Sequence, residues 1–147
     1  YLNIIGMETL GLRMERVCNN AFRLAQALEK LEGVSVNYPL LESSPYHELA
    51  EKQLSGKGGA ILTIRTGSKE RAYKLINHLK YVKIATNIGD VRTLVIHPAS
   101  TIYIHSTPEA MEEAGVYDDT IRISVGIEDI KDLIQDFTEA VESLGEE

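Results

Sequence analysis

The chain has 147 residues, and a single domain of this size buries roughly 70% of the surface of its unfolded chain, enough for a core of its own. Its formal net charge is −7, and no cluster of Lys and Arg is apparent, which argues against nucleic acids and anionic membranes as partners. Nothing in the pattern of charged and apolar residues indicates secretion or membrane insertion. We therefore expect a cytoplasmic protein with a single domain, residues 1–147.

The first segment is apolar, and the chain begins within it, as if the numbering entered a longer protein midway. From Thr9 to Leu31 the apolar residues recur at steps of three and four, which predicts one long amphipathic helix. The residues on its buried face would be Met14, Val17, Ala21, Leu24, Leu28 and Leu31. Gly33 is placed to end this helix in the left-handed conformation.

Short strands and further helices follow in alternation. The apolar patterns predict strands at 34–38, 60–65, 82–85, 94–96 and 121–125, and helices at 47–54, 68–79 and 129–144. Glu128 and Asp129 would favour the positive N-terminal end of the last helix. This order predicts an α/β (α+β) fold, a two-layer sandwich whose small, mainly antiparallel sheet is covered by helices on one face.

One basic residue interrupts the last predicted strand. Arg122 lies among β-branched and apolar residues, and its guanidinium keeps its charge and presents a planar fork of donors. Such a fork fits a carboxylate or a phosphate with two parallel hydrogen bonds. Either a structural Asp or Glu takes that fork or a ligand does, and the strand by itself leaves both readings open.

Five motifs occur in order along the chain: Gly-Met-Glu-Thr-Leu at 6–10, Leu-Arg-Met-Glu-Arg at 12–16, Asn-Ile-Gly at 87–89, His-Pro-Ala-Ser at 97–100 and Ile-Arg-Ile-Ser-Val-Gly-Ile-Glu at 121–128. Together they resemble the carboxyl-terminal domain of the cystathionine-synthase and methionine-lyase family, the pyridoxal-phosphate enzymes of cysteine and methionine metabolism. The resemblance covers most of the chain. It implies the small C-terminal domain of the fold-type I pyridoxal-phosphate transferases.

The resemblance implies a role for two residues. A strand arginine at the position of Arg122 holds the α-carboxylate of the amino-acid substrate with two charge-assisted hydrogen bonds. The loop aligned with residues 87–89 reaches toward the same carboxylate, which makes Asn87 the second expected substrate-binding residue. A structural ion pair for Arg122 and a plain turn for Asn87 are the alternatives. In that turn Gly89 is free to adopt a positive φ.

The cofactor lysine of this family is missing from the chain. In the family it lies in a Ser-x-Thr-Lys motif followed by Gly-His, within a large domain that precedes this segment. Lys69 imitates the motif, but it opens a predicted helix with Ser68 as the N-cap, and no Gly-His follows. We therefore expect an inactive fragment or excised domain, without catalytic, cofactor-binding or metal-binding residues, whose parent enzyme uses pyridoxal 5'-phosphate and supplies the cofactor-binding domain.

Within the family, Asn87 and the residues after it look most like O-acetylhomoserine sulfhydrylases, which replace the acetate of O-acetylhomoserine with sulfide to give homocysteine. Tyr103 departs from that pattern, because a histidine is usual there and a phenol cannot replace an imidazole that titrates near neutral pH. A methionine gamma-lyase and a cystathionine synthase or lyase are alternatives. Outside the family stand a non-catalytic amino-acid-binding domain and an interaction domain that uses the apolar N-terminal run. We also expect a homo-oligomer.

Overall fold

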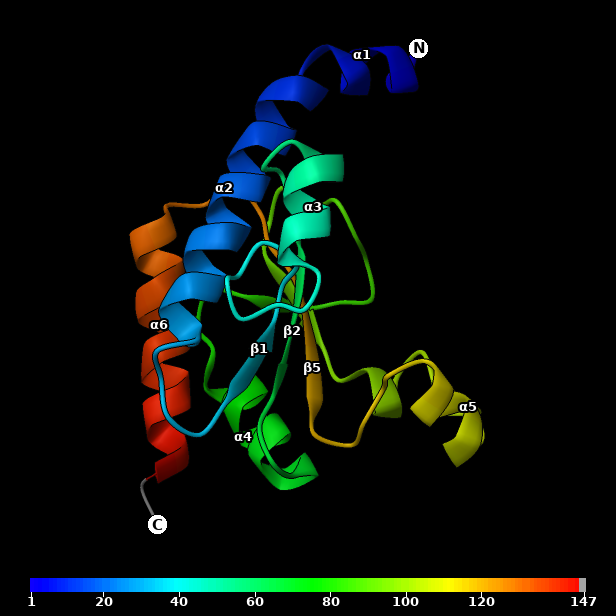
Figure 1. Ribbon diagram of the computed structural model, residues 1–147, viewed down its shortest axis with the longest axis vertical. Helices are drawn as coiled ribbons and strands as arrows, with labels where there is room; N and C mark the ends of the chain where they lie inside the picture. The colour runs from blue at the N-terminus through cyan, green and yellow to red at the C-terminus, as the bar shows by residue number, and fades with distance from the viewer. Residues whose placement is uncertain (146–147) are drawn as a thin grey trace.

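The structure, a computed structural model, describes residues 1–145 of the chain as a five-stranded sheet with helices packed on one face (Figure 1). The strands are β1 (Ser35–Asn37), β2 (Ile61–Arg65), β3 (Lys83–Ile84), β4 (Leu94–Ile96) and β5 (Thr120–Ser124). Their order in the sheet is β1-β2-β5-β4-β3. All neighbours pair antiparallel except β3 and β4, which are parallel. The predicted mainly antiparallel sheet is therefore confirmed.

Three helices form the second layer: α2 (Leu10–Leu28), α4 (Lys69–His78) and α6 (Ile130–Glu142). Helix α6 packs between α2 and α4, and all three contact one another or the sheet (Figure 1). The shorter elements are α1 (Leu2–Glu8), α3 (His47–Leu54), α5 (Pro108–Glu113) and the 3-10 turns η1 (Pro98–Ser100) and η2 (Ser143–Gly145). Helix α5 was not predicted, although Thr107 caps it by accepting from the Ala110 N–H and Pro108 opens it.

Strand alternation decides which side chains enter the core, because successive residues point to opposite faces of a sheet. In β5, Ile121 and Ile123 face the helices and are fully buried. The helices contribute apolar side chains to the same cluster: Ala21, Leu24, Leu28, Leu75, Leu133 and Phe137. Arg122 and Ser124 consequently lie on the other face of the sheet, which the three long helices do not cover.

The first predicted helix begins where expected, at Leu10 directly after Thr9, but it is shorter than predicted. The residues before it form α1, which was not predicted, and Thr9 separates the two helices with φ −106° and ψ 2°. Met14, predicted on the buried face, is 41% exposed, since the first turns of α2 extend beyond the sheet (Figure 1). At its other end α2 stops at Leu28. Gly33, with φ 88°, turns the chain toward β1 and does not end the helix.

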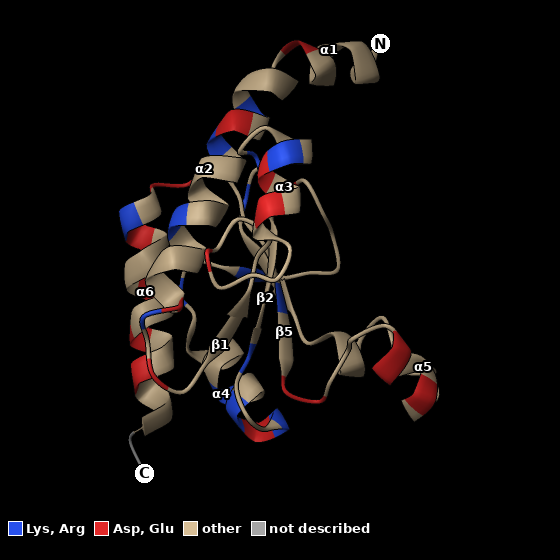
Figure 2. Cartoon of the chain, in the orientation of Figure 1, with Lys and Arg blue, Asp and Glu red and all other residues tan. Residues whose placement is uncertain are grey.

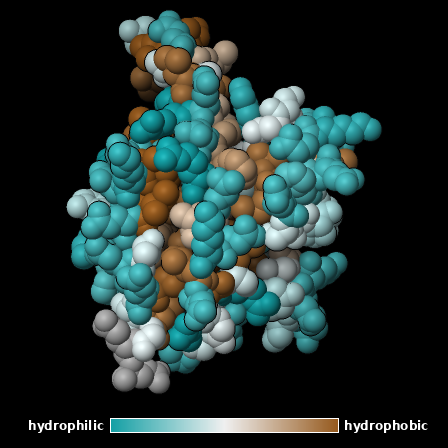
Figure 3. Space-filling model, turned by 60° about the vertical axis from the view of Figure 1, so that its left-hand side comes forward, coloured by the Kyte–Doolittle hydropathy of each residue, from teal (hydrophilic) through white to brown (hydrophobic). Residues whose placement is uncertain are grey.

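The apolar N-terminal run lies on the surface. We call it the N-terminal apolar patch, and it consists of Leu2, Ile4, Ile5, Met7 and Leu10, all of which are exposed. Figure 3 shows apolar surface at the upper end of the molecule, where α1 lies. No helix within residues 1–145 is long and apolar enough to cross a membrane. Lys and Arg are spread over several helices, whereas α5 bears only acidic charges (Figure 2).

Candidate functional site

Arg122 lies near the middle of the sheet, on its open face. It is paired in register with Thr63 of β2 on one side and Ile96 of β4 on the other. The side chain is half-buried, and its Nη2 donates a hydrogen bond to the main-chain carbonyl of Asn87 at 3.3 Å. Its Nε is buried and has no hydrogen-bond partner among the described residues. A guanidinium so placed has donors left for a further acceptor.

The ion-pair alternative for Arg122 finds no support in the structure. Within residues 1–145 the ion pairs are Arg65 with Asp119 and Lys80 with Glu139, and neither includes Arg122. A half-buried cation without a carboxylate partner is costly to keep, unless an anionic ligand completes its coordination. Arg122 is therefore a half-buried cation that has no carboxylate partner among residues 1–145.

Asn87 and Gly89 form the turn that the sequence predicted. The Asn87 side-chain Oδ1 accepts from the Ile88 N–H at 2.9 Å, and Gly89 adopts φ 78°. Because Oδ1 is engaged within the turn, the Asn87 Nδ2 group is the part of the amide that can donate to an anion. The structure thus brings Asn87 beside Arg122, through the main-chain carbonyl of Asn87. This turn also borders a cavity of about 160 Å³ lined mainly by apolar residues, Ile88 among them.

Sequence reasoning missed the residues behind this turn. Asp129, expected to favour the N-terminal end of α6, is its N-cap and accepts from the Lys131 N–H at 2.8 Å. The Glu128 carboxylate instead accepts from the backbone N–H and the hydroxyl of Thr93. Thr93 is fully buried. The only available signal was a polar threonine at the start of a short apolar strand, which could equally have been a surface residue.

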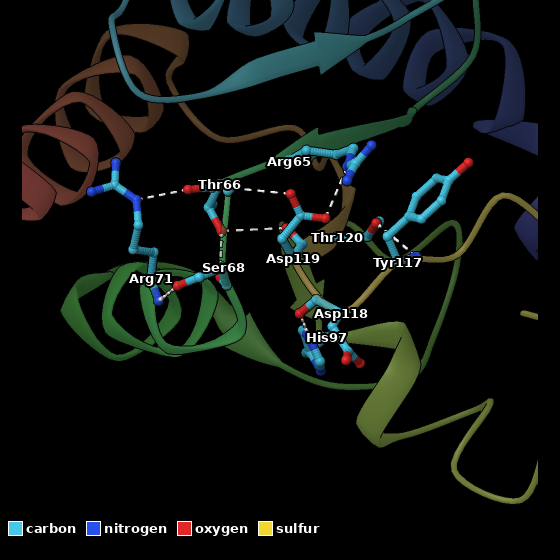
Figure 4. Close-up of polar contacts among 10 residues, drawn as sticks. Arg65, Thr66, Ser68, Arg71, His97, Tyr117, Asp118, Asp119 and Thr120 are labelled. Carbon is cyan, nitrogen blue, oxygen red and sulfur yellow. Dashed lines mark hydrogen bonds and ion pairs between the residues drawn. The ribbon is translucent and has the colours of Figure 1, made fainter. Parts of the chain in front are cut away.

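The His-Pro-Ala-Ser motif joins the end of β4 to the start of β5 (Figure 4). His97 Nε2 lies 2.6 Å from the Asp118 carbonyl oxygen, and Nδ1 lies 2.8 Å from Ser100 Oγ. Since a carbonyl only accepts, we assign the proton to Nε2, and Nδ1 then accepts from Ser100. Asp119, next along the chain, accepts from Arg65 Nε at 2.8 Å and from the Gly67 N–H at 3.0 Å. These bonds hold the strand on which Arg122 lies.

The lysines of this chain lie on its surface. All eight are exposed: Lys30, Lys52, Lys57, Lys69, Lys74, Lys80, Lys83 and Lys131. Lys69 opens α4, where Ser68 accepts from the Arg71 N–H as the predicted N-cap, and its Nζ lies 5.8 Å from the centre of the Tyr73 ring. A lysine that binds pyridoxal phosphate covalently needs an enclosed site that also holds the phosphate and ring. Within residues 1–145 there is also no group of three or more potential metal ligands.

Comparison with known proteins places these features in a family. The family model described as Cys/Met metabolism PLP-dependent enzyme matches residues 1–142. The homocysteine synthase of Schizosaccharomyces pombe is 46% identical over 144 residues, which make up 97% of this chain and 34% of that protein. An O-acetyl-L-homoserine sulfhydrylase of Thermus thermophilus is 44% identical over 96% of this chain and 34% of its own length. An L-methionine gamma-lyase of Fusobacterium nucleatum is 39% identical over 98% of this chain and 37% of its own length.

A solved structure gives the same result. It is a Campylobacter jejuni protein assigned as an O-acetylhomoserine (thiol)-lyase, crystallised with N'-pyridoxyl-lysine-5'-monophosphate. It superimposes with a TM-score of 0.89 and 35% identity, over 93% of this chain and 33% of that chain. The chain spans about a third of the length of these relatives and matches their C-terminal part. The agreement of family model, relatives and fold shows that the chain belongs to the PLP-dependent enzymes of cysteine and methionine metabolism.

Proposed function

We propose that residues 1–147 form a single domain, the C-terminal substrate-binding domain of a longer PLP-dependent enzyme that acts on a sulfur amino acid. In this proposal Arg122 and Asn87 bind the α-carboxylate of the substrate. The observation that supports it most is Arg122 itself, a half-buried guanidinium on the open face of the sheet whose buried Nε has no partner among residues 1–145. Asn87, placed beside it by the 3.3 Å hydrogen bond, adds a second donor.

The physical role of this pair is orientation. A carboxylate held by two donors of one planar guanidinium cannot rotate freely, so the rest of the substrate is directed to one side of the site. Pyridoxal phosphate, when bound by the rest of the enzyme, supplies the electron sink for the bond-breaking steps. The contribution of this chain is to bind the carboxylate, to fix its direction and to exclude water from it. The cytoplasm as location and a homo-oligomeric assembly complete the proposal.

The test uses the full-length enzyme and two classes of substrate. Arg122→Ala should raise KM for amino-acid substrates by about ten- to a hundred-fold, because a lost charge-assisted pair costs about 1.5 to 3 kcal/mol. Arg122→Lys should recover little of the loss, since an ammonium cannot offer two parallel donors. An analogue of the substrate that lacks the carboxylate should be bound equally by wild type and variants. Equal damage to both classes, together with a lower melting temperature, would show that Arg122 is structural.

The proposed reaction is that of an O-acetylhomoserine sulfhydrylase, and a methionine gamma-lyase is the second candidate because such lyases are also relatives at 39% identity. Asn87 supports the sulfhydrylase. Its amide reaches further than the hydroxyl of a serine would, so it closes the carboxylate site more tightly against water. A drier site favours capture of the reacting substrate by sulfide over its release as a keto acid.

A competition assay separates the two candidates. With O-acetylhomoserine and sulfide, the full-length enzyme should form homocysteine much faster than 2-oxobutanoate, and Asn87→Ser should shift that ratio toward 2-oxobutanoate. Asn37→Ser is a matched control, because Asn37 is an exposed asparagine on the edge strand β1. If the wild-type enzyme cleaves methionine or cystathionine faster than it uses O-acetylhomoserine, the sulfhydrylase assignment is wrong and the family assignment stands.

A further inference from the structure

We propose that Thr93 and Glu128 are positioning residues for the carboxylate site: they fasten the turn that contains Asn87 to the end of the strand that contains Arg122. The proposal rests on the proposed function of Arg122 and Asn87. It also gives a reason why Asn87 and Arg122, which are far apart in the sequence, keep a fixed distance. Neither Thr93 nor Glu128 contacts the substrate in this proposal, and both act through the backbone.

The hydrogen bonds at Thr93 have one consistent direction. Its Oγ1 lies 2.9 Å from the Gly126 nitrogen, which can only donate, so the hydroxyl oxygen accepts there. The hydroxyl hydrogen is then free to be donated to Glu128 Oε2, also at 2.9 Å. The other carboxylate oxygen, Oε1, accepts from the Thr93 N–H. Thr93 is 0% exposed, so no water can replace a missing partner without rearrangement.

Gly126 allows the two segments to approach. A Cβ at this position would lie 2.4 Å from the Val91 carbonyl oxygen and 2.6 Å from the Arg92 carbonyl carbon, both of which are backbone atoms that cannot yield without moving the loop. Next to it, the Ile127 N–H donates to the Val91 carbonyl at 2.9 Å. Residues 91–93 are therefore bonded directly to residues 126–128, and their separation is set by backbone contact.

The segment at 126–128 is itself anchored. Asn20, fully buried in α2, donates from Nδ2 to the Gly126 carbonyl at 3.0 Å and to the Glu128 carbonyl at 2.9 Å. Arg16 of the same helix donates to the Glu128 carbonyl at 3.1 Å. The attachment point of the loop thus belongs to the rigid layer of the fold.

The loop beyond this attachment lies on the surface. Its exposed residues include Asn87, Ile88 and Val91. The position of such a surface segment is set by the hydrogen bonds that anchor it to the rest of the fold. One of these is the bond from Arg122 to the Asn87 carbonyl, and another is the Thr93–Glu128 pair, next to the Ile127–Val91 backbone bond. Strand β5 ends at Ser124, just before Gly126. Both the Arg122 and the Glu128 contacts therefore come from the strand of Arg122 or from its direct continuation.

The experiment uses the full-length enzyme with Thr93→Val, which keeps the branched shape and removes the hydroxyl, and Thr93→Ser, which restores it. Thr93→Val should raise KM for carboxylate-containing substrates by about ten-fold with a smaller effect on kcat, since a misplacement of about 1 Å can cost up to a hundred-fold. Thr93→Ser should recover most of that loss. The analogue without a carboxylate should be bound equally by all three proteins.

Asp136→Asn is the matched control. Asp136 is a buried carboxylate of α6 that accepts two loop N–H groups, those of Lys80 and Tyr81 at 3.0 and 3.1 Å. The loop that it holds precedes β3 and does not contain Asn87. This substitution should lower the melting temperature and leave KM unchanged. The proposal is overturned if Thr93→Val lowers only the melting temperature, or if Asp136→Asn raises KM to the same extent.

Two further results keep the inference and the proposed function separable. If Thr93→Val does not fold, Glu128→Gln takes its place, because the amide keeps an acceptor for the Thr93 N–H and loses the acceptor for the hydroxyl. Faster hydrogen exchange at the amides of Ile88 and Gly89 in that variant supports the inference, and unchanged exchange overturns it. If Arg122→Ala weakens substrates with and without a carboxylate equally, the proposed function fails, whereas the exchange result still decides whether Glu128 holds the loop.

Discussion

Arg71 provides a sharp test of which arginines stabilise this fold. Its guanidinium donates to three main-chain carbonyls from separate parts of the chain: Thr66 at 2.7 Å, Leu144 at 3.2 Å and Gly33 at 3.3 Å. The Thr66 and Leu144 bonds are partly buried, whereas the Gly33 bond is exposed. Taking about 1.5, 1 and 0.5 kcal/mol for them in that order, Arg71→Met should lower the free energy of unfolding by about 3 kcal/mol.

Arg65 is the matched comparison, because it forms the more conspicuous interaction. Its Nε lies 2.8 Å from Asp119 Oδ1 and its guanidinium stacks on Tyr117 at 4.1 Å (Figure 4). Half of its side chain is exposed, however, and surface ion pairs contribute about 0 to 1 kcal/mol. We therefore expect Arg65→Met to cost about 1 kcal/mol or less, although it removes an ion pair and Arg71→Met removes none.

Urea unfolding and thermal melting of the chain measure both variants. For a domain of this size a loss of about 3 kcal/mol corresponds to a melting temperature lower by about 6 to 12 °C. The urea m-value should stay constant, since neither substitution changes the surface exposed on unfolding. If Arg65→Met is the more destabilising variant, or if Arg71→Met costs less than about 1 kcal/mol, carbonyl coordination by Arg71 does not hold these segments together.

Three further predictions follow from the structure. Added pyridoxal phosphate should give no stoichiometric internal-aldimine absorption with this chain, and borohydride should fix no cofactor onto a single lysine; a fixed adduct would show that the chain itself binds it. The apolar side chains of Leu2, Ile4 and Ile5 are exposed, so light scattering should show that the isolated chain self-associates and that replacing all three with Gln makes it monomeric. A wild-type chain that stays monomeric at high concentration would contradict this. Burial raises the pKa of Tyr38 well above its usual range, so the stability that its neutral phenol contributes below about pH 10 should be lost as the pH rises further. Tyr38→Phe removes the hydrogen bond to the Gly59 carbonyl; this variant should be less stable by about 1 kcal/mol at neutral pH, and its stability should fall less steeply at alkaline pH.

The sheet and its long helices were predictable because their apolar spacing is regular. Leu62 and Ile64 alternate with Thr63 and Arg65 in β2, and Ile121 and Ile123 alternate with Arg122 and Ser124 in β5, as half-buried strands require. The first helix was misjudged because periodicity reports a face and does not report whether anything covers it. Met14 continues the pattern of Val17 and is nevertheless 41% exposed, since the sheet ends before that turn.

The candidate site was predictable only in part, for a different physical reason. Arg122 stands out because a cation in an apolar strand demands an acceptor, and Asn87 was identified by the resemblance of its loop. Thr93 and Glu128 gave no comparable signal. Their contact joins a strand start to a turn 35 residues further on, and nothing local in either segment specifies the other. Hydrogen bonds between distant buried polar groups become visible only when the chain is folded.

The unpaired state of Arg122 is itself an argument about function. A domain selected only for stability could place an apolar residue at this position of β5, as it does at Ile121 and Ile123, or supply a carboxylate, as Asp119 does for Arg65. Here the guanidinium has one carbonyl partner and a buried Nε without any among residues 1–145. That arrangement costs stability unless an anion arrives. The loop of Asn87 is meanwhile held beside it by the hydrogen bonds between a buried threonine and a half-buried glutamate. A cation left incomplete and a donor loop fixed next to it are together what recognition of a substrate carboxylate requires.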